Sequence, residues 1–159
     1  MRKLIDIQSY LPHRAPMLMV DHILEITKEN VETIFLITTD NIFVRNQQFT
    51  ETGLIENAAQ TCSSIVAKGY LFDDTDKLID GVTVEGFICA IKTIKIHMLP
   101  LVDDVIITKA QLISSFPIDD YTMCTVRCTS FKNDELLLEG EINLLIREIA
   151  VLSTAKVTS

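Results

Sequence analysis

The stretch that most constrains this fold is a run of small and apolar residues from Gly53 to Leu71. Side chains of this kind recur with the helical period of about 3.6 residues, at Ile55, Ala58, Ala59, Cys62, Ile65, Val66 and Gly69. Most other long segments alternate with the shorter period of a β-strand. The sequence therefore predicts one long helix in a chain that is otherwise rich in strands.

Segments on both sides of the helix have the alternation and the β-branched content of strands. Before the helix, residues 20–26 and 31–38 predict a hairpin, and residues 5–11 predict a short helix or turn that ends before Pro12. After the helix, strands are predicted at residues 82–96, 105–114, 121–130 and 136–146. Short polar turns separate these later strands and predict an antiparallel meander.

The connection into the helix, residues 40–52, is polar but carries three apolar side chains, Phe43, Val44 and Phe49. We therefore expect an ordered loop whose aromatic residues point into the core. Thr52 or Gly53 is the expected N-cap of the helix.

A helix that is apolar over most of its surface has to be buried on several sides. One strongly curved antiparallel sheet of about six strands can wrap it, which is the arrangement of the hot-dog fold. The pattern alone leaves this as one α+β architecture among several. The 159 residues are expected to form a single domain over residues 1–159, with its core at about 9–148 and a tail after Ala150 that frays.

Charge and cysteine content narrow the class of protein. The net charge of −8 gives no basic surface for nucleic acid or an anionic membrane, so small molecules or proteins are the expected partners. Four cysteines, Cys62, Cys89, Cys124 and Cys128, form no C-x-x-C pair and lie in apolar runs, which predicts reduced core thiols. Without a signal-like or membrane-spanning apolar stretch, the sequence predicts a cytoplasmic protein, and we expect no metal site or cofactor.

Three motifs resemble those of the 3-hydroxyacyl-acyl-carrier-protein dehydratases of fatty-acid synthesis. Residues 11–25 read LPHRAPMLMVDHILE and are similar to the LPHRxPxLxVDRVLE opening of that family. Residues 55–60 read IENAAQ, similar to the ExxAQ signature of its central helix, and Pro100-x-x-Asp103-Asp104 resembles its PVxxGD turn. The resemblance extends from about residue 9 to residue 146. It implies a hot-dog fold, dimers that share their active sites and a thioester substrate on a phosphopantetheine arm.

The chain departs from that family at the segment that supplies the catalytic histidine. A GHFPxxPxxPG segment precedes the helix in the dehydratases, whereas residues 45–53 here read RNQQFTETG and contain no histidine. The chain is also similar to the dehydratase-like proteins of aryl-polyene and related pigment pathways, in a pattern of Asn41-x-x-Val44 or Asn46-x-x-Phe49 followed by Gly53, Glu56 and Gln60.

Dehydration of a 3-hydroxyacyl thioester needs a base for the proton beside the carbonyl, an acid for the departing hydroxyl, and donors for the oxygen that gains negative charge. Glu56 is the candidate acid or base, and Gln60, one helical turn away, is placed to orient it by a hydrogen bond. The backbone N–H groups of Gly53, Leu54 and Ile55, expected to be unpaired at the helix start, are candidate donors to the thioester oxygen.

Further candidates come from the segments before the helix. His13 of the LPHR motif is a candidate at the site, with a turn residue bonded to backbone as its alternative, and Asn46 and Phe49 are candidate substrate contacts. The leading pair also has structural interpretations. Glu56 can simply stabilise the first helical turn, and Gln60 can be a satisfied interface amide.

The sequence thus favours a 3-hydroxyacyl-thioester dehydratase that acts on acyl carrier protein or CoA thioesters as a homodimer or higher oligomer. The missing histidine keeps open a second function, that of an acyl-binding or scaffolding subunit without catalytic activity that pairs with an active dehydratase as a heterodimer. Thioester hydrolysis on the same fold is a third alternative.

Overall fold

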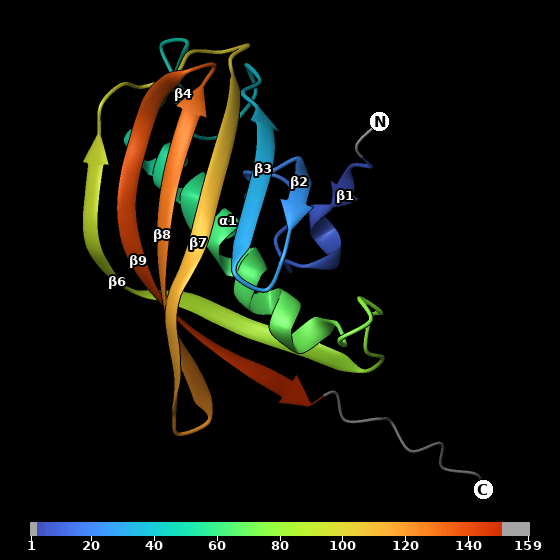
Figure 1. Ribbon diagram of the computed structural model, residues 1–159. Coiled ribbons are helices and arrows are strands. Elements are labelled where there is room, and N and C mark those ends of the chain that lie inside the picture. Colours follow the sequence, from blue (N-terminus) through green and yellow to red (C-terminus); the bar gives the residue numbers. More distant parts are fainter. Residues whose placement is uncertain (1–2, 151–159) are drawn as a thin grey trace, which may run out of the picture.

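A curved antiparallel sheet wraps one long helix, α1 (Glu51–Leu71), in the computed structural model, which describes residues 3–150 (Figure 1). The sheet has seven strands in the order β1-β2-β3-β7-β8-β9-β6. Their bounds are β1 Ile5–Asp6, β2 His22–Ile26, β3 Asn30–Leu36, β6 Val82–Ile96, β7 Val105–Ile118, β8 Tyr121–Lys132 and β9 Glu135–Ala150. This is the predicted hot-dog arrangement.

The sheet has one strand more than the number predicted because Ile5–Asp6, placed by the sequence in a short helix or turn, pairs with β2 before the 3-10 helix η1 (Ile7–Ser9) begins. The strands predicted on both sides of the helix are all present. The tail after Ala150, which was expected to fray, lies outside the described residues.

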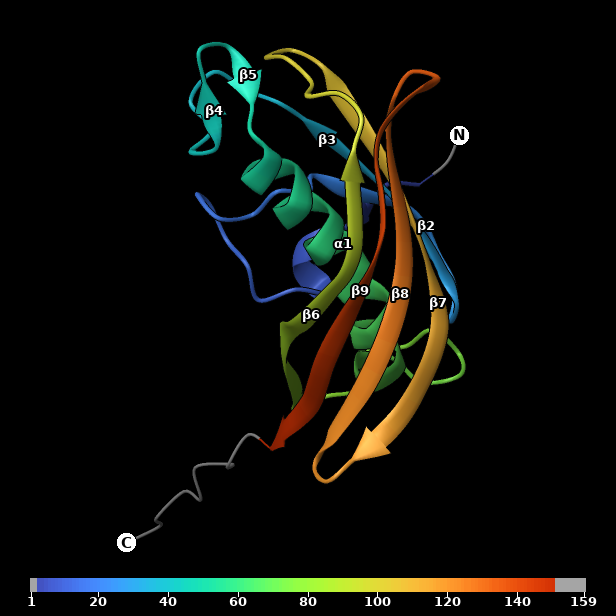
Figure 2. The ribbon, with the colours of Figure 1, turned by 90° about the vertical axis from the view of Figure 1, so that its left-hand side faces the viewer.

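The prediction of a four-stranded meander is wrong in its order. Of the four strands after the helix, only β7, β8 and β9 follow one another as neighbours, while β6 pairs with β9 at the far edge of the sheet and β3 pairs with β7. Figure 2 shows β6 at that edge, alongside α1. Each of these strands has a similar apolar alternation, so the pattern carried no information about which one lies beside which.

The helix begins earlier than predicted. Thr50, in extended conformation, is the N-cap, and its side chain accepts a hydrogen bond from the N–H of Gly53 at 3.4 Å. The segment before it is a small hairpin, β4 (Val44–Arg45) and β5 (Gln48–Phe49), whose turn residues Asn46 and Gln47 have positive φ angles of 50° and 63°. The hairpin therefore replaces the expected loop, and it delivers the fully buried Phe49 directly into the core.

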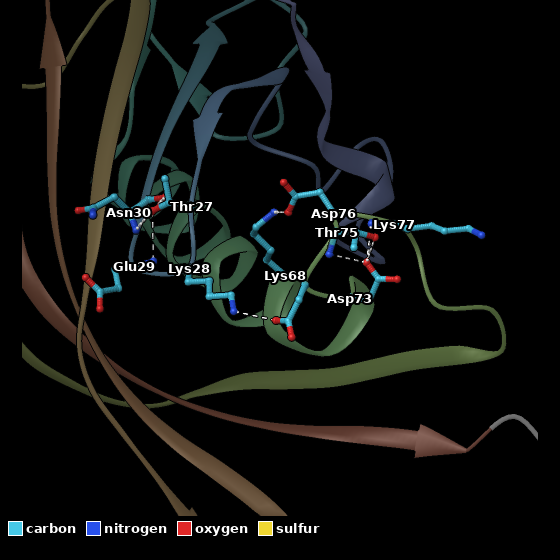
Figure 3. A network of polar contacts seen from close by, with 10 residues as sticks. Thr27, Lys28, Glu29, Asn30, Lys68, Asp73, Thr75, Asp76 and Lys77 are labelled. Carbon is cyan, nitrogen blue, oxygen red and sulfur yellow. Dashed lines mark hydrogen bonds and ion pairs between the residues drawn. The ribbon is translucent and has the colours of Figure 1, made fainter.

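An ion pair from Lys68 holds the other end of the helix to the loop that follows it, and a second pair, between Lys28 and Asp74, joins that loop to the β2–β3 turn (Figure 3). Lys68 Nζ lies 2.6 Å from Asp76 Oδ1, and its side chain keeps only 10% of its exposure. In the loop, the Asp73 carboxylate accepts the backbone N–H groups of Thr75 and Lys77, at 2.8 and 3.0 Å. These contacts order the exposed loop that follows the helix.

Three of the four cysteines are core thiols as predicted, namely Cys62, Cys124 and Cys128. Cys89 is exposed on β6, so that prediction is wrong for this residue, because β6 is an edge strand whose residues are mostly exposed. No helix in residues 3–150 is long and apolar enough to span a membrane.

Candidate active site

The site is built on one flank of α1, where Glu56 and Gln60 lie one helical turn apart. Gln60 Nε2 donates a hydrogen bond to Glu56 Oε1 at 2.8 Å, as expected from their spacing. Glu56 is half-buried, whereas Gln60 is almost fully buried. The carboxylate therefore lies at the border between the interior and the surface, and an interior amide holds one of its oxygens.

The Gln60 amide is itself fixed by the segment that enters β2. Its Oε1 accepts the backbone N–H of Met19 at 2.7 Å, and its Nε2 also donates to the Met17 carbonyl at 2.8 Å. Together with the bond to Glu56, these contacts use both N–H groups and the oxygen of the amide. The orientation of Gln60 is thus determined by the backbone around it, and Glu56 receives an N–H group and not a second oxygen.

The other oxygen of Glu56 is available for chemistry. Within residues 3–150, Oε2 accepts no hydrogen bond. Glu56, Ser63 and Tyr70 are the half-buried residues of one side of the helix, seven residues apart, so they form a stripe along it that the sheet does not cover completely. A carboxylate with one oxygen held and one open can take or give a proton at this flank.

The backbone donors predicted at the helix start are less open than expected. The N–H of Gly53 donates to Thr50 Oγ1, and that of Leu54 donates to the Thr50 carbonyl at 3.0 Å. Gly53 also has a packing role, since a Cβ there would lie 2.6 Å from Phe43 Cβ and 2.6 Å from Phe49 Cε2. Substrate binding by Gly53, Leu54 and Ile55 stays a prediction. At Gly53 and Leu54 it requires a substrate oxygen to replace a partner already present, and Ile55, the fifth residue of α1, lies beyond the N–H groups that a helix leaves unpaired at its start.

The two candidates of the preceding segment are placed differently from each other. Asn46 is exposed at the tip of the β4–β5 hairpin. Phe49 is fully buried, with its ring centroid 5.8 Å from that of Phe35 and its backbone N–H bonded to the Pro100 carbonyl. Both remain predicted substrate contacts, but Phe49 has an evident role in the core.

No histidine in residues 3–150 is hydrogen-bonded to Glu56. His13 is half-buried, and its Nδ1 is a buried atom without a partner among the described residues. His22 is exposed on β2, and His97 Nε2 lies 3.4 Å from Glu139 Oε2. His13 thus stays a prediction, and it alone of the three has a ring nitrogen that is buried and unused.

Sequence reasoning missed a set of buried polar residues behind the site. Asn57, next to Glu56 in the helix, donates to the Met19 carbonyl at 2.7 Å and accepts the hydroxyl of Thr108 at 2.6 Å. Thr108 lies 2.9 Å from the hydroxyl of Ser130. Two signals in the sequence could have indicated this set. Asn57 interrupts the apolar run of the helix, and Thr108 and Ser130 are single hydroxyl residues at inward positions of apolar strands.

The thiol on the apolar face of the helix is not an alternative nucleophile. The hydrogen bond with Cys128 and complete burial both raise the pKa of Cys62 well above its usual range. The reactive form of cysteine is the thiolate, so Cys62 stays protonated and inert at neutral pH.

Comparison with known proteins identifies the family. A family model described as ApeP-like, ApeP dehydratase, matches residues 5–152. The chain belongs to the ApeP-like family. This confirms the resemblance to dehydratases that the LPHR and ExxAQ motifs indicated. No curated protein matches the chain in sequence.

Several solved structures have the same fold as this ApeP-like chain, although their sequences are only distantly similar to it. The dehydratase heterocomplex ApeI:P from Xenorhabdus doucetiae matches with a TM-score of 0.72 and 15% identity, over 89% of this chain and 91% of that chain. Cj0977, a sigma28-regulated virulence protein from Campylobacter jejuni, gives 0.57 and 12%, over 89% and 82%. A hypothetical thioesterase from Streptococcus pneumoniae, solved with coenzyme A, gives 0.58 and 9%, over 81% and 87%.

Proposed function

We propose that this ApeP-like protein eliminates water from a 3-hydroxyacyl thioester, with Glu56 as the acid/base. The observation that carries this proposal is the state of the Glu56 carboxylate. One oxygen is held at 2.8 Å by an amide with no freedom to rotate, and the other is open on a half-buried flank. Such a group is oriented before the substrate arrives, which is what general acid/base catalysis requires.

A single carboxylate can complete this elimination. The open oxygen of Glu56 removes the proton from C2, and the electron pair left there forms the double bond as the C3–O bond breaks. The same proton then passes from Glu56 to the departing hydroxyl, so that the products are water and the enoyl thioester and Glu56 is again a carboxylate. This route needs no histidine, in keeping with its absence from residues 45–53.

The substrate is proposed to be a thioester on the phosphopantetheine arm of an acyl carrier protein or of CoA. The dehydratase motifs support this class of substrate, and the related thioesterase fold was solved with coenzyme A. The three buried, reduced thiols are in keeping with a cytoplasmic setting.

We propose that β6 is the surface that receives a second hot-dog subunit. Among the described strands, β6 pairs only with β9, so one side of its backbone is unpaired. Phe87, Ile88 and Ile91 of this strand are 44%, 38% and 47% exposed. A long apolar edge of this kind favours pairing with another strand, and it lies alongside the helix that carries Glu56. The partner is either a second copy or an active dehydratase.

A second candidate function is that of a subunit without catalytic activity in a heterodimer with an active dehydratase. The observation that favours it is the β4–β5 hairpin, which stands where the dehydratases carry their histidine and turns through the exposed Asn46. The similar fold of the dehydratase heterocomplex ApeI:P supports a heteromeric assembly for this chain.

One experiment separates these functions. The purified protein is incubated with a 3-hydroxyacyl-CoA and with the same acyl group on an acyl carrier protein, and the enoyl product and free thiol are measured. We expect enoyl product, and a loss of about 10²–10⁴-fold in Glu56→Gln. Glu51→Gln, which changes an exposed carboxylate in the first turn of the same helix, is the matched control and should keep the activity.

The remaining outcomes are distinct. Equal activity in Glu56→Gln and the native protein refutes the role of Glu56. Thioester binding without product, with turnover restored only by an added dehydratase subunit, supports the second function. Free thiol without enoyl product identifies hydrolysis.

A further inference from the structure

The backbone at Met19 is held by side chains of α1 at both of its polar groups. Gln60 Oε1 accepts its N–H at 2.7 Å, and Asn57 Nδ2 donates to its carbonyl at 2.7 Å. The side chain of Met19 is fully buried, and Asn41 Nδ2 lies 3.3 Å from its sulfur. The segment that fixes Gln60 is therefore fixed in turn by Asn57, the residue next to Glu56.

The orientation of the Asn57 amide is set from the sheet. Thr108, on β7, donates its hydroxyl proton to Asn57 Oδ1 at 2.6 Å. A hydroxyl has one proton, so the contact of 2.9 Å between Thr108 and Ser130 is a bond in which Ser130 donates. All three residues are fully buried. With its oxygen occupied by Thr108, Asn57 turns its amide nitrogen toward Met19.

We propose that Thr108 is a positioning residue for the site. Its hydroxyl fixes Asn57, Asn57 and Gln60 clamp the Met19 backbone, and the clamped segment holds Gln60 against Glu56. The effect on turnover rests on the proposed dehydratase function, whereas the effect on the Met19 backbone does not. The hydroxyl of Thr108 bonds Asn57 and Ser130 and not Glu56, so Thr108 acts on the site only through Asn57. It belongs to none of the dehydratase motifs, and the sequence therefore did not indicate it as a site residue.

The fold supplies a matched control for Thr108. Thr33, on β3, is directly opposite Thr108 in the strand register, and it is also fully buried. Its hydroxyl bonds the helix at Thr61, one turn after Asn57, at 2.8 Å. Among the hydrogen bonds of residues 3–150, none joins the Thr61 side chain to Met17 or Met19. The variants Thr33→Val and Thr108→Val thus each remove one buried hydroxyl between the sheet and the helix. Only Thr108→Val breaks the hydrogen bond to Asn57 and so the link to the site.

The test compares Thr108→Val, Thr33→Val and Thr108→Ser in the full chain. Amide hydrogen exchange is read at Met19 by NMR, and turnover is measured with a 3-hydroxyacyl-CoA. We expect exchange at Met19 to rise about tenfold or more in Thr108→Val, relative to Thr33→Val, because loss of the Thr108 hydroxyl frees the Asn57 side-chain amide and so loosens the clamp on the Met19 segment. We expect kcat to fall about tenfold or more with KM within about twofold, and Thr108→Ser to restore both.

Two results would overturn the proposal: equal changes in Thr108→Val and Thr33→Val, or no recovery in Thr108→Ser. If Thr108→Val does not fold, Asn57→Ala removes the Thr108 bond together with the bond to the Met19 carbonyl, so exchange at Met19 should rise at least as much, and an unchanged exchange rate there overturns the proposal. If the native protein shows no turnover, the dehydratase function fails, and exchange at Met19 still decides whether Thr108 fixes the segment.

Discussion

Replacement of Gly53 by alanine tests the packing at the start of α1. The added methyl group would lie 2.6 Å from Phe43 Cβ, 2.6 Å from Phe49 Cε2 and 2.7 Å from Phe49 Cζ. Phe43 Cβ is attached directly to a backbone whose carbonyl accepts the Thr50 N–H at 3.0 Å, so it cannot retreat without moving the hairpin and the N-cap together. The ring of Phe49 is fully buried and has little room to turn.

Two opposing effects set the change in the free energy of unfolding of Gly53→Ala. Overpacking of a filled site costs about 1–3 kcal/mol, and a clash with rigid neighbours belongs at the upper end. Alanine in place of glycine within a helix returns about 1 kcal/mol. We therefore expect Gly53→Ala to lower the free energy of unfolding by about 1–2 kcal/mol.

Gly69 provides the control within the same helix. A Cβ at Gly69 would meet no atom within 4 Å, and the residue is exposed. Gly69→Ala should therefore raise the free energy of unfolding by about 0.5–1 kcal/mol through helix propensity alone. The two variants should differ by about 1.5–3 kcal/mol, or about 3–12 °C in Tm for a chain of this size.

The assay is urea unfolding of both variants at one protein concentration, because any association would change the apparent stability. A Gly53→Ala protein as stable as Gly69→Ala would refute the packing argument. Phe49→Leu should recover part of the loss in the Gly53→Ala background, since it removes the two ring atoms that meet the new methyl group.

Two further predictions concern buried titratable and charged groups. Burial raises the pKa of Cys124 to about 11 from 9.0, so the unfolded chain ionises first, and the free energy of unfolding should fall by up to roughly 2–3 kcal/mol as pH rises from 9 to about 11. Urea unfolding across that range checks this, and Cys124→Ala should reduce the slope. Asp76→Asn should lower the stability by about 1–3 kcal/mol, because it leaves the mostly buried Lys68 ammonium without its carboxylate. Lys68→Met should change it by less than about 1 kcal/mol, since Asp76 stays 77% exposed to water; thermal unfolding showing the opposite order would contradict this explanation.

Secondary structure and fold class were largely predictable here, because the spacing of apolar residues in the helix differs clearly from their alternation in the strands. Apolar residues at helical spacing from Gly53 to Leu71 could only be buried by the strands around them, and the LPHR and ExxAQ motifs indicated which arrangement does so. The placement of Glu56 and Gln60 on one edge also followed from spacing, since residues four apart on a helix are neighbours. Their hydrogen bond confirmed it.

Other features depended on contacts between residues far apart in the chain. The sheet order, with β6 beside β9 and β3 beside β7, is a choice among strands of similar pattern. The N-cap is Thr50, and not Thr52 or Gly53 as predicted, because the β4–β5 hairpin sets where the chain enters the helix. Gly53 is needed for packing, since Phe43 and Phe49 leave no space for a Cβ at this position.

The sequence by itself determined the helix, the strands, the family and the position of Glu56. Only the tertiary structure decided what holds Glu56, because the partners of Gln60 and Asn57 are backbone groups of Met17 and Met19, about forty residues earlier. Backbone N–H and C=O groups are the same for every residue type, so no pattern of side chains can reveal that they meet. Thr108, fifty-one residues after Asn57, became visible as part of the site for the same reason, when the folded chain brought its hydroxyl to the amide.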